Sequence, residues 1–204
     1  MKYDLDKHEK EILEDFEKGE FVSVDHLKKE FKLAQSAAKN FMTNQIKQLA
    51  EKLSEQLKLQ QLKLVTAESC TGGGLSYWLT SIAGSSAWFE RGFVTYSNLA
   101  KMECLGVSEK TLQTFGSVSE KTALEMAEGA LKNSDADVSV AITGIAGPDG
   151  GTKEKPVGTV WIAVGGTNQH TVAKHFLFSG DRLQIRESTI EEALALLLSF
   201  IDSK

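Results

Sequence analysis

The chain has 204 residues, of which 41% are hydrophobic and 25% charged, and its formal net charge is -5 at pH 7. This composition is typical of a folded globular protein, and the two cysteines are too few for a disulfide scaffold. The negative charge gives no electrostatic basis for tight nucleic-acid binding. The first ten residues are charged throughout, and the longest apolar run, residues 194–201, is too short to cross a bilayer. We therefore expect a cytoplasmic protein with neither a membrane nor a nucleic-acid partner.

Two regions of different composition follow one another. Residues 1–63 contain 24 charged residues and only one glycine, Gly19, which is typical of exposed helices. Apolar residues at helical spacing predict one helix that ends at Gly19 and a second that is capped by Ser23 and reaches Phe41. A third stretch carries Ile46, Leu49, Leu53 and Leu57 along one face. The remaining 16 glycines lie in residues 64–204, which we interpret as a compact α/β domain.

Apolar runs and glycine-containing turns alternate along this second region. We expect strands at residues 62–67, 88–96, 137–143, 158–164 and 171–178. We expect helices at residues 75–82, 98–106, 119–132 and 183–201, with Ser119 as the cap of the third. Residues 144–156 are predicted to form a glycine-rich loop. Strands that alternate with helices indicate a layered α/β sheet, in which ligands bind near the carboxyl ends of parallel strands.

The first candidate for chemistry is the run AESCTGG at residues 67–73. It places the Ser69 hydroxyl and the Cys70 thiol between a strand and the amino end of a helix, where free backbone N–H groups favour an oxyanion or a phosphate. It is not a phosphate-binding Walker loop, because no Lys-Ser or Lys-Thr pair follows the glycines, and it is not a G-x-G-x-x-G fingerprint. A simple helix-capping role for Ser69 or Thr71 explains the same residues equally well.

A serine nucleophile needs a base. His170 and His175 lie in or near a late strand, so a Ser-His-Asp triad has little support. Lys101 is the other candidate, about one helical turn after a strand that ends near Tyr96. Lowering a lysine pKa by about 3 units takes roughly 4 kcal/mol, which burial and a neighbouring cation can supply. Taken alone, an exposed surface lysine is the simpler interpretation.

Two further loops are candidates for ligand binding. Residues 143–151, TGIAGPDGG, follow an apolar strand, and their glycines allow the backbone to approach a ligand closely. Arg182 precedes the last helix and suits a carboxylate or a phosphate. The alternative for residues 143–151 is an ordinary flexible connection, and the alternative for Arg182 is a surface ion pair. No His, Cys or carboxylate pair has metal-ligand spacing, so we expect no metal and no cofactor.

Six segments in the same order resemble the CinA carboxyl-terminal domain family: AESCTGG, FERGFVTYSNLAK, LGVSEKTL, FGSVSEKTALEMAEGA, AITGIAGPDGGTKEKPVGTVWIAV and GDR. The resemblance covers about residues 45–202 and implies a three-layer α/β/α domain with a mixed, mostly parallel sheet at residues 44–204. Residues 1–43 then form a charged helical head, in which residues 3–24 weakly resemble ribbon-helix-helix antitoxin-type proteins. The family implies hydrolysis of the carboxamide of nicotinamide mononucleotide by a homo-oligomer.

The same resemblance implies residue roles. Ser69 becomes the nucleophile and Lys101 its base, Tyr96 assists the pair, and Arg182 helps to hold the substrate. The other implied substrate-binding positions are Cys70, Thr71, Gly72, Gly73, Thr143, Gly144 and Gly147, and the amides from Cys70 to Gly73 are expected to hold the oxyanion. Three alternatives stay open: a nucleotide-binding sensor without turnover, an antitoxin-like DNA-associated protein, and an amidase with Cys70 as nucleophile.

Overall fold

The computed structural model describes residues 27–202, with side chains described from residue 42 onward. The chain divides into two units, Met1–Phe41 and Met42–Lys204. The helix expected to end at Gly19, the cap at Ser23 and the antitoxin-like segment at residues 3–24 all lie outside the described residues.

The helix α2 runs without interruption from Leu27 to Leu59. The expectation of two separate stretches, one ending at Phe41, is wrong, because residues 27–59 contain neither glycine nor proline to end a helix. In the second unit the apolar face predicted for the later stretch is confirmed. Ile46, Leu53 and Leu57 are fully buried in the core.

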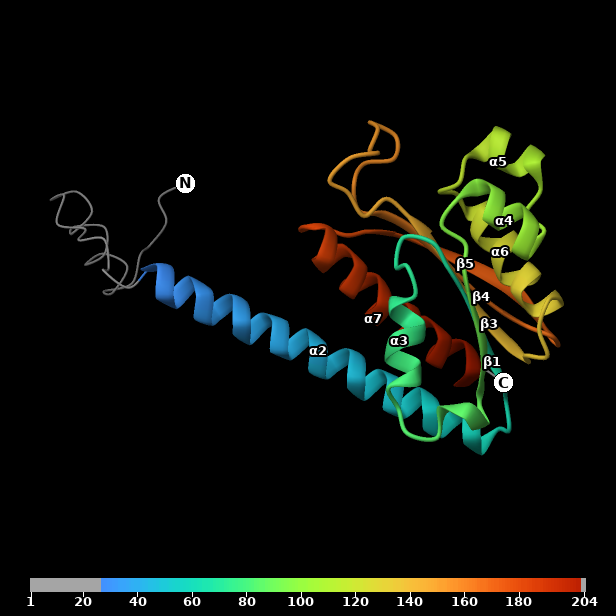
Figure 1. Cartoon of the computed structure of the whole chain (residues 1–204), viewed down its shortest axis with the longest axis horizontal. Coiled ribbons are helices and arrows are strands. Elements are labelled where there is room, and N and C mark those ends of the chain that lie inside the picture. The colour runs from blue at the N-terminus through green and yellow to red at the C-terminus, as the bar shows by residue number, and fades with distance from the viewer. Residues whose placement is uncertain (1–26, 203–204) are drawn as a thin grey trace, which may run out of the picture. The chain divides into compact units, whose positions relative to one another are not determined.

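Five strands form one mixed sheet in the order β2-β1-β3-β4-β5 (Figure 1). The strands are β1 (Leu64–Glu68), β2 (Phe89–Val94), β3 (Val138–Gly144), β4 (Thr159–Gly166) and β5 (Gln169–Leu177). The strand β1 pairs in parallel with both β2 and β3, whereas β4 is antiparallel to both β3 and β5. Four of the five strands therefore run in one direction, which confirms the predicted mixed and mostly parallel sheet.

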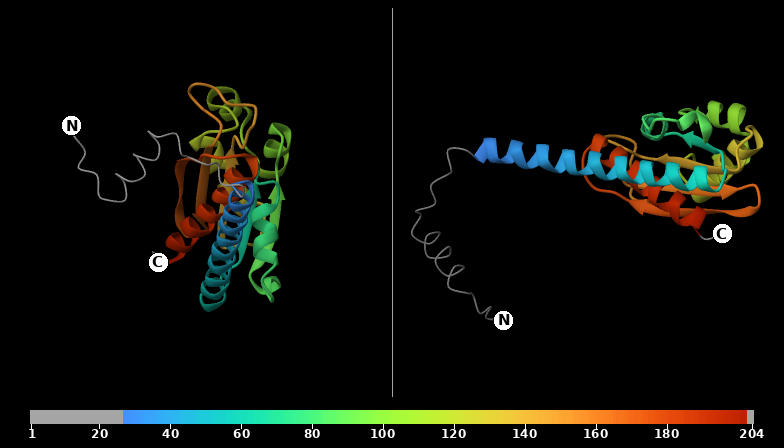
Figure 2. Two further views of the ribbon diagram at one scale, coloured as in Figure 1. Left: turned by 90° about the vertical axis from the view of Figure 1, so that its left-hand side faces the viewer. Right: turned by 90° about the horizontal axis from the view of Figure 1, so that it is seen from below.

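Helices cover both faces of this sheet. They are α3 (Gly74–Thr80), α4 (Asn98–Leu105), α5 (Glu109–Phe115), α6 (Glu120–Lys132) and α7 (Arg182–Asp202), with a 3₁₀ turn at Ser85–Ala87. The helices α3 and α7 lie on one face together with residues 46–57 of α2, and α4, α5 and α6 lie on the other (Figure 2). The sequence did not indicate α5 or the 3₁₀ turn. Among the described residues, no helix is long and apolar enough to cross a membrane.

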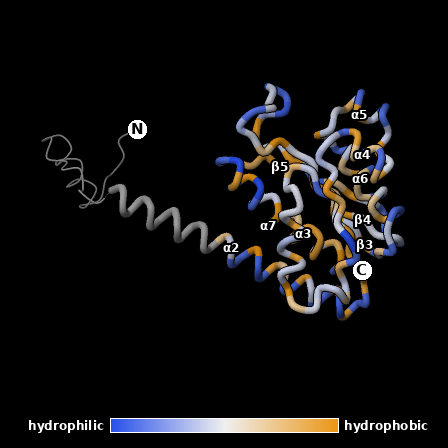
Figure 3. Tube along the Cα trace, viewed as in Figure 1, coloured by the Kyte–Doolittle hydropathy of each residue, from blue (hydrophilic) through white to orange (hydrophobic). Residues whose placement is uncertain are grey.

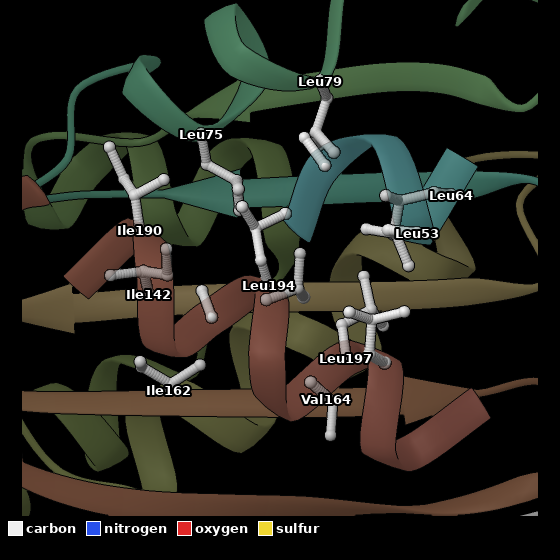
Figure 4. Packing of buried hydrophobic residues seen from close by; sticks show 14 of the residues in the cluster. Leu53, Leu64, Leu75, Leu79, Ile142, Ile162, Val164, Ile190, Leu194 and Leu197 are labelled. Carbon is white, nitrogen blue, oxygen red and sulfur yellow. The ribbon is translucent and has the colours of Figure 1, made fainter. Parts of the chain in front are cut away.

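The alternation of side chains along the strands separates two cores. Val140 and Ile142 of β3 belong to the cluster under α3 and α7, whereas Ala141 belongs to the cluster under α6. Figure 4 shows Leu194 and Leu197 of α7 against the sheet, and Figure 3 shows hydrophobic residues gathered along the central strands. Burial of these side chains at about 25 cal/mol per Å² of apolar surface is what holds the layers together.

Candidate active site

Ser69 lies at the carboxyl edge of the three parallel strands. Its backbone N–H donates to the carbonyl of Ile142 at 3.0 Å, and the preceding Glu68 is paired with Val94 on one side and Ile142 on the other. The residues that follow β1 and β2, and the end of β3, therefore meet at one edge of the sheet. This is the position at which α/β sheets bind ligands.

Lys101 comes to Ser69 from the helix α4, which begins just after β2. The Ser97 hydroxyl caps this helix by accepting from the N–H of Ala100 at 3.1 Å. Lys101 Nζ lies 2.9 Å from Ser69 Oγ and donates to the carbonyl of Thr95 at 2.8 Å. Two side chains that are 32 residues apart in the sequence are thus joined by a hydrogen bond.

The Lys101 side chain is only 1% exposed. Burial disfavours the charged ammonium and lowers the pKa of Lys101 from the ordinary 10.5 to about 8. None of the ion pairs in the described part of the chain involves this lysine, so no carboxylate holds it in the charged form. About one Lys101 side chain in ten is then neutral at pH 7 and able to accept a proton.

The thiol of Cys70, next to Ser69, is made less reactive by burial. Burial raises the pKa of Cys70 to about 11, so its thiol remains protonated near neutral pH. Its sulfur packs against the end of β3, where a Cβ at Gly144 would lie 3.1 Å from Cys70 Sγ and 2.7 Å from Val160 Cγ2. Cys70 is therefore a packing residue of the loop, and Gly144 makes room for it.

Arg182, the first residue of α7, joins two loops of the site. Its Nη1 donates to the carbonyl of Gly147 at 2.7 Å, and its Nη2 donates to the Tyr96 hydroxyl at 3.0 Å. The Thr143 hydroxyl donates to the carbonyl of Ser117 at 2.6 Å and ties the end of β3 to the segment before α6. These three bonds hold the loops in place around Ser69.

A cavity of about 260 Å³ opens among these groups, near the lower end of the size range of small-molecule sites. Its lining includes Ser69, Cys70, Tyr96, Lys101, Thr143, Gly144, Gly147 and Arg182. Eight of the eleven residues predicted for the site therefore meet at one cavity. A buried amine beside a hydroxyl at the wall of such a cavity is the arrangement of a nucleophile and its base.

The CinA C-terminal domain model matches residues 46–201. The chain belongs to this family. The nicotinamide-nucleotide amidohydrolase PncC of Escherichia coli strain K12 is 51% identical over 154 residues, which are 76% of this chain and 93% of that protein. A CinA-like protein of Syntrophobacter fumaroxidans is 52% identical over 149 residues, but these are 73% of this chain and only 35% of that longer protein.

Solved structures of the family share the fold. The competence/damage inducible protein CihA of Agrobacterium tumefaciens superposes with a TM-score of 0.75 at 47% identity, over 76% of this chain and 94% of that one. A CinA superfamily protein of Escherichia coli gives a TM-score of 0.73 at 43% identity, over 76% and 90% of the two chains. These structures confirm the fold class that the family resemblance implied.

Three predicted site residues lie away from the cavity lining: Thr71, Gly72 and Gly73. The Gly72 N–H donates to the carbonyl of Ser69 at 3.0 Å, so it is not free to hold an oxyanion. The Thr71 carbonyl instead accepts from Arg186 Nη2 at 2.6 Å. In this family member, the turn TGG shapes the loop that carries Ser69 and anchors it to α7.

The structure adds residues that the sequence analysis did not single out. The fully buried carboxylate of Glu68 accepts from the N–H groups of Leu75 and Ser76 at 3.0 and 2.8 Å, and thereby fixes the loop that carries Ser69. The Thr95 carbonyl orients Lys101, and Asp149 lines the cavity. The signal that could have identified Glu68 is its place at the end of the apolar strand LVTAE. A carboxylate in a buried strand needs hydrogen-bond partners, because burial of an unpaired charge is costly.

Proposed function

We propose that this protein hydrolyses the carboxamide of nicotinamide mononucleotide to nicotinate mononucleotide and ammonia. The observation that carries the proposal is the contact of 2.9 Å between Ser69 Oγ and the buried amine of Lys101 at the wall of a ligand-sized cavity. The relatives named as nicotinamide-nucleotide amidohydrolases supply the substrate class.

Neutral Lys101 is the general base in the first half of the reaction. It accepts the Ser69 proton while Oγ attacks the carboxamide carbon, and a tetrahedral oxyanion forms. The resulting ammonium of Lys101 then gives its proton to the amide nitrogen, which leaves as ammonia, and an ester to Ser69 remains. The hydrogen bond to the Thr95 carbonyl uses one N–H of Lys101 and keeps the amine in reach of Oγ.

Water completes the cycle. Lys101, neutral again, accepts a proton from a water molecule that attacks the ester carbonyl, and Ser69 recovers its proton as the acid product leaves. The Cys70 amide is the backbone donor of this loop that we assign to the oxyanion, because Cys70 lines the cavity and the Gly72 amide is already used. The cationic ring of the substrate withdraws electrons from the carboxamide and makes its carbon easier to attack.

Purified protein should release ammonia and the acid nucleotide in equal amounts from nicotinamide mononucleotide. Because Lys101 activates the nucleophile, the rate should be unchanged by EDTA. Binding of the nucleotide without ammonia release would favour the sensor alternative. Ammonia release that EDTA abolishes and a divalent ion restores would contradict the serine–lysine mechanism.

We further propose a cytoplasmic homo-oligomer in which residues 44–204 form the catalytic domain and residues 1–43 a separate head. Two unpaired cysteines are suited to a reducing compartment. Large apolar side chains are exposed on α3, β2 and α4, namely Tyr77, Val94 and Leu99, and exposed apolar surface of this kind is available to a second subunit. Light scattering on the intact chain should give the mass of more than one subunit.

A further inference from the structure

Asp149 is the carboxylate-bearing residue in the lining of the Ser69 cavity. It is exposed, and among the described residues it takes part in no ion pair and in no hydrogen bond of its side chain. A carboxylate at a cavity wall without a protein partner is available to a ligand.

The loop that carries Asp149, drawn in orange near the top of Figure 1, is held at several points. The Gly147 carbonyl accepts from Arg182 at 2.7 Å, two residues before Asp149. After it, Lys155 Nζ donates to the carbonyl of Phe115 at 2.7 Å, and the Gly158 N–H donates to the carbonyl of Ile145 at 2.8 Å. Asp149 therefore lies on an anchored loop, which loses little conformational entropy when a ligand binds.

The charges of the cavity match those of a nicotinamide nucleotide. Such a substrate has a permanent positive charge on its ring nitrogen and a negative phosphate, and the cavity offers one carboxylate, Asp149, and one guanidinium, Arg182. When the cationic ring moves from water into the cavity, it loses hydration and is repelled by Arg182 and Lys101. A negative charge in the cavity is needed to offset both costs. Asp149 is the lining group that can provide it.

We propose that Asp149 is the counter-ion of the substrate's pyridinium ring and selects N-substituted, cationic carboxamides over neutral ones. The inference rests on the proposed function and names the feature of the substrate that the site recognises. It also makes chemical sense, because the ring charge that Asp149 selects is the one that activates the carboxamide for attack. Asp149 acts on binding, so its loss should raise KM and leave kcat nearly unchanged.

Two small ligands isolate this interaction. Nicotinamide and 1-methylnicotinamide have the same ring and carboxamide, but only the second is a cation, and neither has a phosphate that would respond to a change of charge. Their dissociation constants are measured by calorimetry on protein that carries Ser69→Ala, so that no turnover disturbs the measurement. The variants Asp149→Asn and Glu154→Gln are compared, since Glu154 is an exposed carboxylate of the same loop outside the cavity lining.

We expect 1-methylnicotinamide to bind more tightly than nicotinamide. Asp149→Asn should raise the dissociation constant of 1-methylnicotinamide about tenfold, which is the effect of one partly solvated charge pair. The dissociation constant of nicotinamide should change less than twofold. Glu154→Gln should change neither. Equal affinity for the two ligands, or an equal loss for both in Asp149→Asn, would overturn the inference. A cation preference that depends on Asp149, found together with an absence of ammonia release from nicotinamide mononucleotide, would leave this inference standing and refute the proposed function instead.

Discussion

In the proposed mechanism, burial of Lys101 sets the pH at which this amine can accept the Ser69 proton. With the pKa of Lys101 near 8, the neutral form increases about tenfold between pH 7 and pH 9. We expect kcat/KM to rise by about this factor over that range and to level off above it, and Lys101→Met to remove the catalysed rate. A pH profile that is flat from pH 7 to 9, or that rises only near 10.5, would show that this amine is not the base.

The same burial links Lys101 to stability. Its folded pKa lies below the unfolded value, so between about pH 8 and 10.5 the unfolded chain binds more protons and stability rises with pH. Lys101→Met should therefore have its largest advantage in free energy of unfolding over the wild type below pH 8. This advantage should decrease by up to about 3 kcal/mol as the pH approaches 10.5. Denaturant unfolding of both proteins at several pH values measures this change.

Substitution distinguishes the proposed nucleophile, Ser69, from its neighbour Cys70. Ser69→Ala removes the attacking oxygen and should lower kcat at least a thousandfold. Cys70→Ala removes only a buried, protonated thiol, and it should cost about 1 kcal/mol of stability while most of the turnover remains. Steady-state assays and thermal melts of both variants give the answer, and the reverse pattern would assign the chemistry to Cys70.

The sequence allowed part of this site to be predicted at the residue scale. Ser69 and Lys101 were proposed through the family resemblance, whereas residue spacing alone left each with a simple structural explanation. Thr95 could not be found, because its contribution is a backbone carbonyl. Asp149 was not singled out within the candidate loop 143–151, since nothing in a sequence shows which loop residues line a cavity.

At the element scale, the position of Lys101 depends on the close packing of α4 against α6. A Cβ at Gly129 of α6 would collide with the carbonyl of Leu105, the last residue of α4. Gly129→Ala should therefore displace α4, destabilise the protein by about 1–3 kcal/mol and lower kcat.

Thermal melts and steady-state kinetics test this prediction, with Glu128→Ala as the matched control on the exposed side of the same helix. A Gly129→Ala protein with unchanged melting temperature and kcat would mean that α4 is not positioned by this contact. An equal loss in both variants would point to a general effect of substitution in α6 and not to the contact with Leu105.

Elements differed in how clearly the sequence marked them. The helix α6 begins after its cap Ser119 and ends at Lys132, as expected, because its cap, first-turn Glu120 and apolar face all agree. The seven-residue α5 was missed, since so short a helix has no measurable periodicity. The reversed direction of β4 was also not predictable, because a buried strand has the same apolar pattern in either direction.

At the scale of the whole molecule, α2 contributes to the core of the second unit. Ile46, Ala50, Leu53 and Leu57 are all fully buried. A chain that begins at Thr43 keeps these residues and should retain its turnover per active site, while its oligomeric mass or melting temperature changes because the head is absent. A chain that begins at Leu64 loses all four and should not fold.

Light scattering, thermal melts and ammonia assays on the two shortened chains test this division of roles. An unchanged mass and melting temperature for the Thr43 chain would make the head a loose appendage. A folded but inactive Thr43 chain would show that part of the site lies before residue 43.

In the proposed mechanism, Ser69 forms a covalent ester with the acyl group of the substrate while Lys101 moves the proton. The most direct measurement is mass spectrometry of peptides from protein quenched with acid during turnover of nicotinamide mononucleotide. We expect the acyl nucleotide on the peptide that contains Ser69, with fragmentation placing it on Ser69, and no adduct in Ser69→Ala. An adduct on Cys70, or undiminished ammonia release by Ser69→Ala, would contradict it.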